Sequence, residues 1–269
     1  MNITDINARG MVLLGCGKMG SALLAGWLKN GVKASSVWVQ DPFPSDWVNE
    51  TGVHVNEALP EHPAVLLIAV KPQMMDEALP SAERFGTGRT LILSVAAGTS
   101  IARYEQSFGS DAPIIRTMPN TPAAVGQGVT ALIGNNQVDQ DQMDLAEALM
   151  SAVGQTVRLQ SEAQMDAVTG VSGSGPAYVF HMIECLARAG EAEGLPAEMA
   201  MTLAKATVAG AGALAVQAEE TPSQLRVNVT SPNGTTQAGL EQLMDEESGL
   251  PPLMVRTVKA ATDRSKELG

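Results

Sequence analysis

The sequence contains few aromatic residues and has a deficit of basic residues. Phe, Trp and Tyr make up 3% of the 269 residues, so the chain has little of the exposed ring surface on which nucleic-acid bases stack. Acidic residues outnumber basic residues by 29 to 17, and the resulting formal net charge of −12 disfavours contact with a phosphate backbone. These two deficits argue against nucleic acid as a partner.

Cysteines and long hydrophobic runs are also scarce. The two cysteines, Cys16 and Cys185, cannot make a disulfide framework and match no zinc-ligand spacing, so no metal site is expected. No run of about 18 apolar residues suggests a membrane span, and the opening ten residues lack the charged and apolar regions of a secretory signal. We therefore expect a cytoplasmic protein with no membrane partner.

The first part of the sequence repeats an order of apolar run, glycine-containing turn and helical segment. Runs such as VLLIAV are continuous rather than alternating, as in parallel strands that are covered on both faces. This alternation predicts an α/β fold with a Rossmann-type, doubly wound sheet, in a dinucleotide-binding domain spanning residues 1–160. The predicted strands lie within residues 10–15, 36–41, 64–73, 90–98, 112–120, 128–134 and 154–159.

Residues 161–269 contain helical segments and no strand candidates, which predicts a second, all-helical domain. Helices are expected at residues 179–195, 197–217 and 250–268, and Ser172 and Ser174 are expected to cap the first of them. Segment 197–217 is rich in Ala and Gly and nearly free of charge, so it should be buried on most sides. It is either the central helix of a monomeric bundle or a surface covered by a second subunit, and the thinness of the helical domain favours the second subunit.

The segment GCGKMG follows the first predicted strand and opens a helix. Its glycines have the Gly-x-Gly-x-x-Gly spacing of a dinucleotide-binding turn, and the strand-to-helix context makes the motif specific. Gly15 allows the tight turn, Gly17 lets a pyrophosphate approach the backbone, and Gly20 lets the helix pack closely on the strand. The first amides of the helix would then face the phosphates.

Asp41 ends the second predicted strand, 21 residues after Gly20. An acidic side chain at this place accepts hydrogen bonds from the adenosine ribose of NAD. No arginine occurs in the ten residues that begin with Asp41, so this segment has no guanidinium group to bind a 2′-phosphate. The expected cofactor is NADPH or NADH, and Asp41 favours NADH.

Two further turns should flank the nicotinamide half of the cofactor, because ligands of open α/β sheets lie beyond the carboxyl ends of the strands. These turns are AVKPQ, residues 69–73, and SVAAG, residues 94–98. Lys71 is a catalytic cation or a solvated loop residue; Pro72 forces an extended backbone at Lys71, so we favour positioning over proton transfer. Asn120, in the segment RTMPNTP, either hydrogen-bonds a ligand or caps its own turn.

Several of these motifs together resemble one family, the Δ1-pyrroline-5-carboxylate reductases of proline biosynthesis. GCGKMG, AVKPQ, RTMPNTP, VSGSGPAYVF and VTSPNGTTQAGL occur in the order and spacing of that family, from residue 15 to about residue 240. The resemblance implies reduction of the cyclic imine 1-pyrroline-5-carboxylate to L-proline with NAD(P)H, the last step of proline biosynthesis. It also implies that the helical domain binds substrate and interlocks with a partner subunit in a homodimer, and that dimers assemble further into rings.

The match to the family's motifs assigns expected roles to residues of this sequence. The hydroxyl of Thr236 matches the group that hydrogen-bonds the ring nitrogen, which makes Thr236 the catalytic candidate. The expected cofactor-binding residues are Leu14, Gly15, Gly17, Lys18, Met19, Gly20, Asp41, Asn56, Ala69, Val70, Lys71, Pro72, Val95, Ala96, Ala97 and Asn120. The expected substrate-binding residues are Ser231, Gly234, Thr235 and Thr236.

The segment TSPNGTTQAGL opens a helix with many exposed amides and hydroxyls. The substrate of the family carries a carboxylate, and a helix N-terminus with free amides binds anions without a basic side chain. Gly234, Thr235 and Thr236 are expected to supply those amides. The family usually has two glycines after the proline, and Asn233 replaces the first of them. Asn tolerates a left-handed backbone better than most residues do. Its side chain would narrow the substrate pocket, so the size of the ring that the pocket accepts stays open.

Hydride transfer to a C=N bond depends more on position than on acid catalysis. A threonine hydroxyl is a poor acid, so we expect the imine to bind already protonated. His54 and His62 belong to the adenosine side of the predicted cofactor domain. His181, on the first helix of the second domain, is expected to be a core or interface residue rather than a general acid.

Other functions share parts of this pattern. A β-hydroxyacid dehydrogenase needs a lysine on the first helix of the second domain, and residues 174–193 contain none. A non-catalytic dinucleotide-binding regulator would keep GCGKMG but would not need TSPNGTT. A reductase of another cyclic imino acid, such as a six-membered piperideine carboxylate, stays open because of Asn233.

Overall fold

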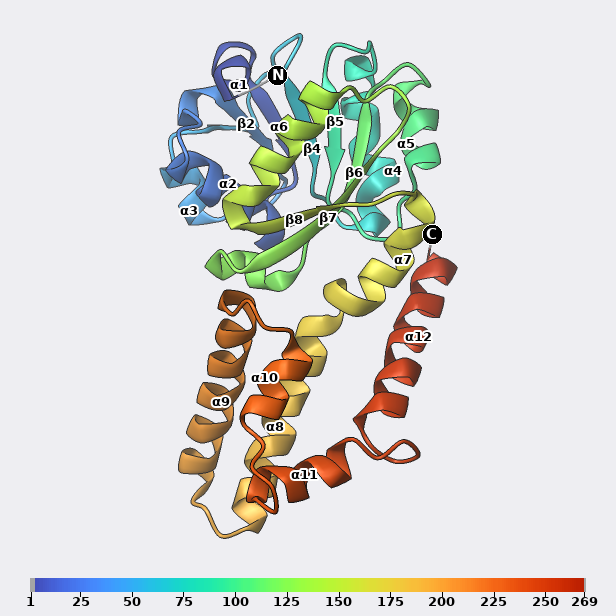
Figure 1. The fold of residues 1–269 in the computed structure, drawn as a ribbon. Helices are drawn as coiled ribbons and strands as arrows, with labels where there is room; N and C mark the ends of the chain where they lie inside the picture. The colour runs from blue at the N-terminus through green and yellow to red at the C-terminus, as the bar shows by residue number, and fades with distance from the viewer. Residues whose placement is uncertain (1–2, 269) are drawn as a thin grey trace. The chain divides into compact units, whose positions relative to one another are not determined.

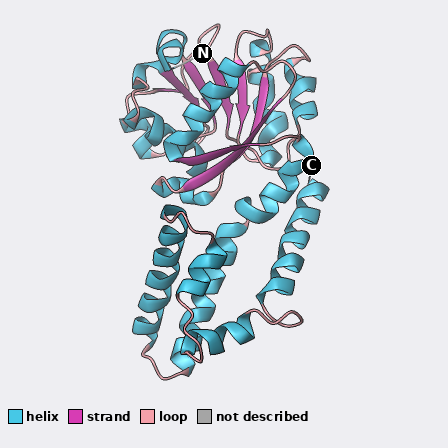
Figure 2. Ribbon diagram, viewed as in Figure 1, coloured by secondary structure: helices cyan, strands magenta, loops and turns pink. Residues whose placement is uncertain are grey.

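The computed structural model describes residues 3–268, which fall into two compact units (Figure 1). The first unit runs to Gly173 and takes up the chain again at Ala261, whereas the second comprises Ser174–Ala260. Within the described chain, strands occur only in the first unit, as Figure 2 shows. The predicted fold class, a Rossmann-type α/β sheet followed by an all-helical region, is confirmed; the domain boundary at residue 160 stays a prediction.

Eight strands form one sheet in the order β3-β2-β1-β4-β5-β6-β7-β8. Strands β1 to β6 pair in parallel and have the strand order of a Rossmann fold. All the predicted strands are present, and the sequence pattern missed only β3, which has two residues. The strands are β1 Met11–Leu14, β2 Val37–Gln40, β3 His54–Val55, β4 Val65–Ile68, β5 Leu91–Ser94, β6 Ile114–Met118, β7 Gly128–Gly134 and β8 Gly154–Arg158.

Helices connect these strands and cover the sheet. The α-helices of the first unit are α1 Ile3–Arg9, α2 Lys18–Lys29, α3 Asp46–Glu50, α4 Met75–Ala78, α5 Ile101–Phe108, α6 Gln140–Met150 and α7 Met165–Val168. Short 3₁₀ helices lie at Ala34–Ser36, Pro72–Met74, Leu79–Ser81, Glu83–Phe85, Thr121–Val125, Ser151–Val153 and Glu162–Gln164.

Apolar side chains cover both faces of the sheet, as the continuous apolar runs predict. All residues of β1 and β4 are buried. On one face Leu13 belongs to the same core cluster as Trp27 of α2, and on the other Leu14 belongs to the same cluster as Tyr104 of α5. Trp27 also ties α2 to α6, because its Nε1 donates to the carbonyl of Leu149 at 2.8 Å. Because the core packs on both faces of the sheet, it holds the strands in place. The strand ends, where the candidate site lies, are held with them.

The direction of the chain reverses at β7, which runs antiparallel to β6 and parallel to β8. Between β6 and β7 the chain has only the 3₁₀ helix Thr121–Val125, which is too short for the crossover that parallel strands need. Between β7 and β8, α6 provides that crossover. It begins with a capping box in which Asp139 and Gln142 each accept a hydrogen bond from the other's amide, at 2.8 and 3.0 Å.

The second unit is built from helices that pack through small residues. Its longest pair, α8 and α9, lie side by side (Figure 1), and their buried residues are Ala187, Ala200 and Ala204. A Cβ added to Gly190 would lie 3.3 Å from the Cβ of Ala200, so glycine lets the two helices approach closely. The helices are α8 Gly175–Ala192, α9 Ala197–Gln217, α10 Pro222–Asn228, α11 Thr235–Leu243 and α12 Leu250–Leu268, whose last residues belong to the first unit.

The prediction that Ser172 and Ser174 cap α8 is wrong. The chain enters α8 from α7 through a π-helix, Thr169–Gly173. The backbone at Ser174 is therefore helical, with φ −86° and ψ −19°, and its side chain makes no capping hydrogen bond. A capping serine needs an extended backbone at its own position, which a continuing helix does not provide.

Helix α9 exposes most of its apolar surface. Leu203, Leu214 and Val216 are 50%, 53% and 69% exposed. The helix itself is confirmed, whereas its burial at the centre of a monomeric bundle is wrong. Within residues 3–268, α9 is also the one helix that is long and apolar enough, by length and composition, to cross a membrane. The sequence of α9 contains no long uninterrupted apolar run, because Gly, Thr and Lys residues interrupt the segment.

Candidate functional site

The glycine turn after β1 is held by close backbone contacts. Gly15 has φ 80°, and a Cβ there would lie 2.9 Å from the Cγ1 of Val70. A Cβ at Gly20 would lie 2.8 Å from the carbonyl oxygen of Gly15. Gly15 therefore makes the turn and Gly20 lets α2 start against it, which are the roles expected from their spacing.

Gly17 differs from these two glycines because no protein atom crowds it. Its φ of −69° suits any residue, and a Cβ there would meet no protein atom within 4 Å. As the N-cap of α2 it also offers no side chain to the first amides of the helix. The open space and the uncapped amides together form a cradle that fits a phosphate group.

Four turns that carry predicted cofactor residues meet at one edge of the sheet. The register places the last residues of four neighbouring strands next to one another, namely Leu14, Gln40, Ile68 and Ser94. The structure therefore brings together the predicted residues 14–20, 41, 69–72 and 95–97. This is the edge at which open α/β sheets bind their ligands.

Asp41 faces the glycine turn. Its Oδ2 accepts a hydrogen bond from the amide of Cys16 at 2.6 Å, and its Oδ1 accepts one from the amide of Phe43 at 2.8 Å. Asn56 holds the main chain of Asp41: its side chain accepts from the Asp41 amide at 3.0 Å and donates to the Asp41 carbonyl at 2.9 Å. Asn56 adopts a left-handed backbone, with φ 54°. Asp41 and Asn56 thus place a carboxylate beside the glycine turn, and no pattern in the sequence showed the link between them.

The turn after β4 has the shape that its proline predicts. Lys71 is extended, with φ −65° and ψ 147°, and Pro72 begins the 3₁₀ helix that follows. The side chain of Lys71 is exposed, and the amide of Ala69 donates to the carbonyl of Leu14 at 2.8 Å. An extended and exposed main chain suits backbone contacts with a ligand, in line with a positioning role for Lys71.

The turn after β5 is fixed to its neighbours by hydrogen bonds. The amide of Val95 donates to the carbonyl of Ile68 at 3.0 Å, and the amide of Ala96 donates to the Oγ of Ser94 at 3.2 Å. Ala97 is exposed at the end of this turn. Residues 95–97 therefore present main chain and small side chains at the same edge of the sheet as the glycine turn.

Asn120 links two segments of the first unit and does not cap its own turn. Its side-chain carbonyl accepts from the amide of Val129 at 2.9 Å, and its amide group donates to the carbonyl of Ser172 at 3.2 Å. The 3₁₀ helix that follows has no side-chain cap. A side-chain amide has a second hydrogen and a second lone pair, so contact with a ligand stays a prediction.

In the second unit, the loop before α11 forms the turn that the sequence predicts. Asn233 has φ 58°, which confirms a left-handed backbone at the position of the missing glycine. The amide of Gly234 donates to the carbonyl of Ser231 at 3.0 Å, so it is already engaged and not free for a carboxylate. Thr235 and Thr236 lie exposed in the first turn of α11, whose N-cap has no capping side chain. Their two amides and the Thr236 hydroxyl are the groups that can bind an anion here.

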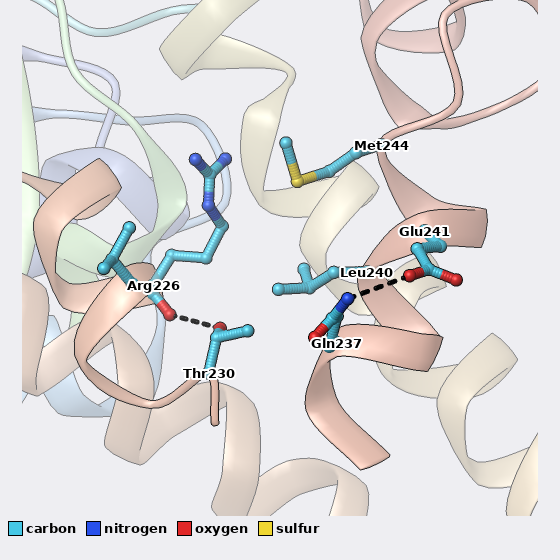
Figure 3. A pocket seen from close by; sticks show the side chains of 7 residues that line it. Arg226, Thr230, Gln237, Leu240, Glu241 and Met244 are labelled. Atoms are coloured by element: carbon cyan, nitrogen blue, oxygen red, sulfur yellow. Dashed lines mark hydrogen bonds between the residues drawn. The ribbon is translucent and has the colours of Figure 1, made fainter. Parts of the chain in front are cut away.

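Residues of α10, α11 and their flanking turns line an open hollow of about 420 Å³ next to this loop (Figure 3). Thr230 is one of the lining residues, and its Oγ1 donates to the carbonyl of Arg226 at 2.6 Å. The lining is apolar at Val227, Leu240 and Met244 and polar at Arg226, Gln237 and Glu241. None of the predicted substrate residues lines this hollow, so it is distinct from the amides of Thr235 and Thr236.

The histidines do not supply an evident proton donor. His54 stacks on Trp38, with ring centroids 4.5 Å apart. His181 is exposed on α8 rather than buried in a core, and its Nδ1 lies 3.2 Å from the Oε2 of Glu184.

Burial raises the pKa of Cys16 in the glycine turn, so its thiol stays protonated at neutral pH. Among residues 3–268, no group of three His, Cys, Asp or Glu side chains is arranged to hold a metal ion.

Comparison with known proteins matches both parts of the chain. The family model described as pyrroline-5-carboxylate reductase dimerisation matches residues 162–268, and the model described as NADP oxidoreductase coenzyme F420-dependent matches residues 11–98. The pyrroline-5-carboxylate reductase of Synechocystis sp. is 44% identical over 264 residues, which cover 96% of this chain and 97% of that protein. The chain belongs to the pyrroline-5-carboxylate reductase family.

Solved structures of pyrroline-5-carboxylate reductases share the fold along nearly the whole chain. The reductase from Coxiella burnetii aligns with a TM-score of 0.90 at 34% identity, over 97% of this chain and 98% of that chain. The pyrroline carboxylate reductase from Plasmodium falciparum, solved with NADP bound, aligns with a TM-score of 0.81 at 28% identity, over 97% of this chain and 98% of that chain. These matches confirm the family that the motifs of the sequence indicate.

Proposed function

We infer that the chain reduces 1-pyrroline-5-carboxylate to L-proline with NAD(P)H, as the last step of proline biosynthesis. Its membership of the reductase family supports the reaction. The observation that supports the cofactor most directly is Gly17, where a side chain would meet no protein atom within 4 Å and the backbone would suit any residue. Packing against the protein gives no reason for a glycine at this place, whereas a ligand in the open space would give one.

We place the cofactor along the edge of the sheet where the four turns meet. Residues 14–20 would hold the pyrophosphate through main-chain amides, and Asp41 with Asn56 would hold the adenosine ribose. Residues 69–72 and 95–97 would flank the nicotinamide, and the free hydrogen of the Asn120 amide would face the same side. These roles need mostly main-chain groups, which the glycines and alanines of the set leave accessible.

The substrate would be held by its two polar ends. The amides of Thr235 and Thr236 bind the carboxylate, supported by the partial positive charge at the start of α11. The Thr236 hydroxyl accepts a hydrogen bond from the protonated ring nitrogen. Bound NAD(P)H supplies the hydride that converts the C=N bond into an amine. Because the nitrogen arrives already protonated, Thr236 needs to orient the ring and not to act as an acid.

We propose that NADH is preferred over NADPH because Asp41 would repel a 2′-phosphate. A single like charge at about 4 Å costs roughly 1 to 4 kcal/mol near a protein surface. Asp41→Asn should therefore lower the ratio of kcat/KM for NADH to kcat/KM for NADPH about tenfold. Asp46→Asn, at an exposed acid in α3, should leave the ratio unchanged. A native enzyme that turns over NADPH faster than NADH would contradict this preference.

The protein forms a homo-oligomer, and we propose that its basic unit is a homodimer joined through the helical residues 161–269. The exposed apolar face of α9 supports this, as does the match of the dimerisation model to residues 162–268. We further propose that the dimers assemble into rings and that the enzyme works in the cytoplasm, with α9 covered by a second copy rather than by lipid.

Ring size is tested by initial rates with 1-pyrroline-5-carboxylate and with its six-membered homologue, using each reduced nucleotide. We expect rapid turnover of the five-membered ring and much slower turnover of the larger one. Faster turnover of the six-membered ring would favour a reductase of another cyclic imino acid. Binding of the nucleotide without turnover of either ring would favour a dinucleotide-binding regulator.

A further inference from the structure

Two buried hydroxyl groups lie next to the turn formed by residues 95–97. Tyr104 of α5 and Ser94, the last residue of β5, are both fully buried, and their hydroxyl oxygens are 2.5 Å apart. Apolar residues of one core cluster pack around Tyr104, Ile92, Ile101 and Phe108 among them, and Thr99 also hydrogen-bonds to its hydroxyl. Burying hydroxyl groups costs free energy unless they are hydrogen-bonded, and an apolar pair could fill the same space. The polarity of this pair therefore needs a reason beyond packing.

Ser94 connects the pair to the turn. Its Oγ accepts the hydrogen bond from the amide of Ala96 at 3.2 Å, and its carbonyl accepts one from the hydroxyl of Thr117 at 2.8 Å. Burial raises the pKa of Tyr104, and its hydrogen bonds with Ser94 and Thr99 offset this only in part, so the phenol stays protonated at neutral pH. The phenol thus holds Ser94 by a neutral hydrogen bond, and Ser94 holds the amide of Ala96.

We propose that Tyr104 is a positioning residue for the nicotinamide half of the cofactor, acting through Ser94 on the turn 95–97. The inference rests on the proposed function, which assigns the nicotinamide to this turn. Tyr104 is too deeply buried to touch the cofactor itself. Without the phenol hydroxyl, the Ser94 side chain loses the partner that orients it, and the Ala96 amide loses a fixed acceptor.

The test is Tyr104→Phe, which removes the hydroxyl and keeps the ring. Binding is measured by isothermal titration calorimetry with NADH and with ADP-ribose, which lacks the nicotinamide. We expect the affinity for NADH to fall about 3- to 10-fold, the effect of one hydrogen bond, while the affinity for ADP-ribose is unchanged. Equal losses for both nucleotides, or no loss for either, would overturn the proposal. A native chain that bound neither nucleotide would overturn the proposed function as well.

A second variant tests the route through Ser94 and keeps the proposal falsifiable if Tyr104→Phe folds poorly. Ser94→Ala should lower the affinity for NADH by a similar factor and spare ADP-ribose. In the Ser94→Ala background, Tyr104→Phe should change the affinity for NADH by less than about twofold, because coupled residues are not additive. Fully additive losses would show that Tyr104 does not act through Ser94 and would overturn the proposal.

Discussion

Single residues in the glycine turn meet different physical demands. Gly15 needs its positive φ, and Gly20 needs the lack of a Cβ beside the carbonyl of Gly15. Gly17 needs neither, since its backbone is ordinary and its surroundings are open. Two of the glycines thus serve the fold, and we assign the third to the proposed phosphate site. This difference gives a test that separates stability from binding at neighbouring positions.

Gly17→Ala should leave the protein folded and weaken its cofactor binding. Because the added methyl group meets no protein atom, the free energy of unfolding should change by less than about 1 kcal/mol. The same methyl group would occupy the space of the pyrophosphate, so the affinity for NADH should fall at least about tenfold. Urea unfolding and calorimetric titration measure the two effects.

Gly15→Ala is the matched control at the other kind of glycine. It forces a Cβ into a left-handed backbone and against Val70, so it should destabilise the fold by more than about 1 kcal/mol. If Gly17→Ala bound NADH as well as the native chain does, the cradle at the start of α2 would not be the phosphate site.

The sequence predicts positions of site residues better than it predicts their hydrogen bonds. The spacing from Gly20 correctly located Asp41 at the end of β2, and the left-handed backbone at Asn233 followed from the glycine that it replaces. The bond from Cys16 to Asp41 and the engaged amide of Gly234 were not foreseen. Such contacts depend on the exact path of loops that meet only after folding, and no local pattern encodes them.

At the scale of elements, Glu162 joins parts of the first unit that are distant in sequence. Its Oε1 accepts hydrogen bonds from the Arg116 side chain of β6 and from the amide of Ile101 at the start of α5, both at 2.8 Å. Arg116 is only 7% exposed, so it depends on this partner. The segment that follows β8 is thereby fixed to the strand and the helix that flank the turn 95–97.

Glu162→Ala should therefore destabilise the fold. The variant leaves a buried guanidinium without its partner, and we expect the free energy of unfolding to fall by about 2 kcal/mol, a value reduced for the partial exposure of Glu162. Glu267→Ala removes the exposed ion pair with Arg264 and should cost less than about 0.5 kcal/mol. Urea unfolding of both variants measures this, and equal effects would contradict the role given to Glu162.

The order and type of the elements follow from the sequence, and the exceptions have local causes. Continuous apolar runs identified every strand except β3, whose two residues are too few to form a pattern. The antiparallel course of β7 follows from the short Thr121–Val125 connection, which apolar runs alone do not reveal. The π-helix before Ser174 turned an expected cap into a continuous helix. Apart from β3, the connections between elements, and not the elements themselves, escaped the pattern.

At the scale of the whole molecule, the apolar surface of α9 calls for a partner. The helix is as apolar as a membrane span, yet its family region is one of dimerisation. Composition predicts that the helix is covered, and the thinness of the helical domain favours a second subunit as the cover. The exposed apolar residues of α9 are consistent with that proposal.

Leu203→Glu should dissociate the dimer, because it places a charge within the apolar face of α9, where Leu203 is 50% exposed in one chain. Analytical ultracentrifugation should show a monomer, or a dissociation constant raised by at least about 100-fold. Trp47→Glu, at an exposed residue of α3, is the control and should remain dimeric. A Leu203→Glu protein that sediments like the native one would contradict the proposed interface.

The proposed reaction passes hydride from a reduced nicotinamide to a five-membered cyclic imine. The most direct measurement is turnover of 1-pyrroline-5-carboxylate with NADH that carries deuterium at C4 of the nicotinamide, with each C4 epimer used separately. We expect L-proline with one deuterium at its C5 from one of the two epimers. Proline without deuterium from either epimer, or no proline at all, would contradict it.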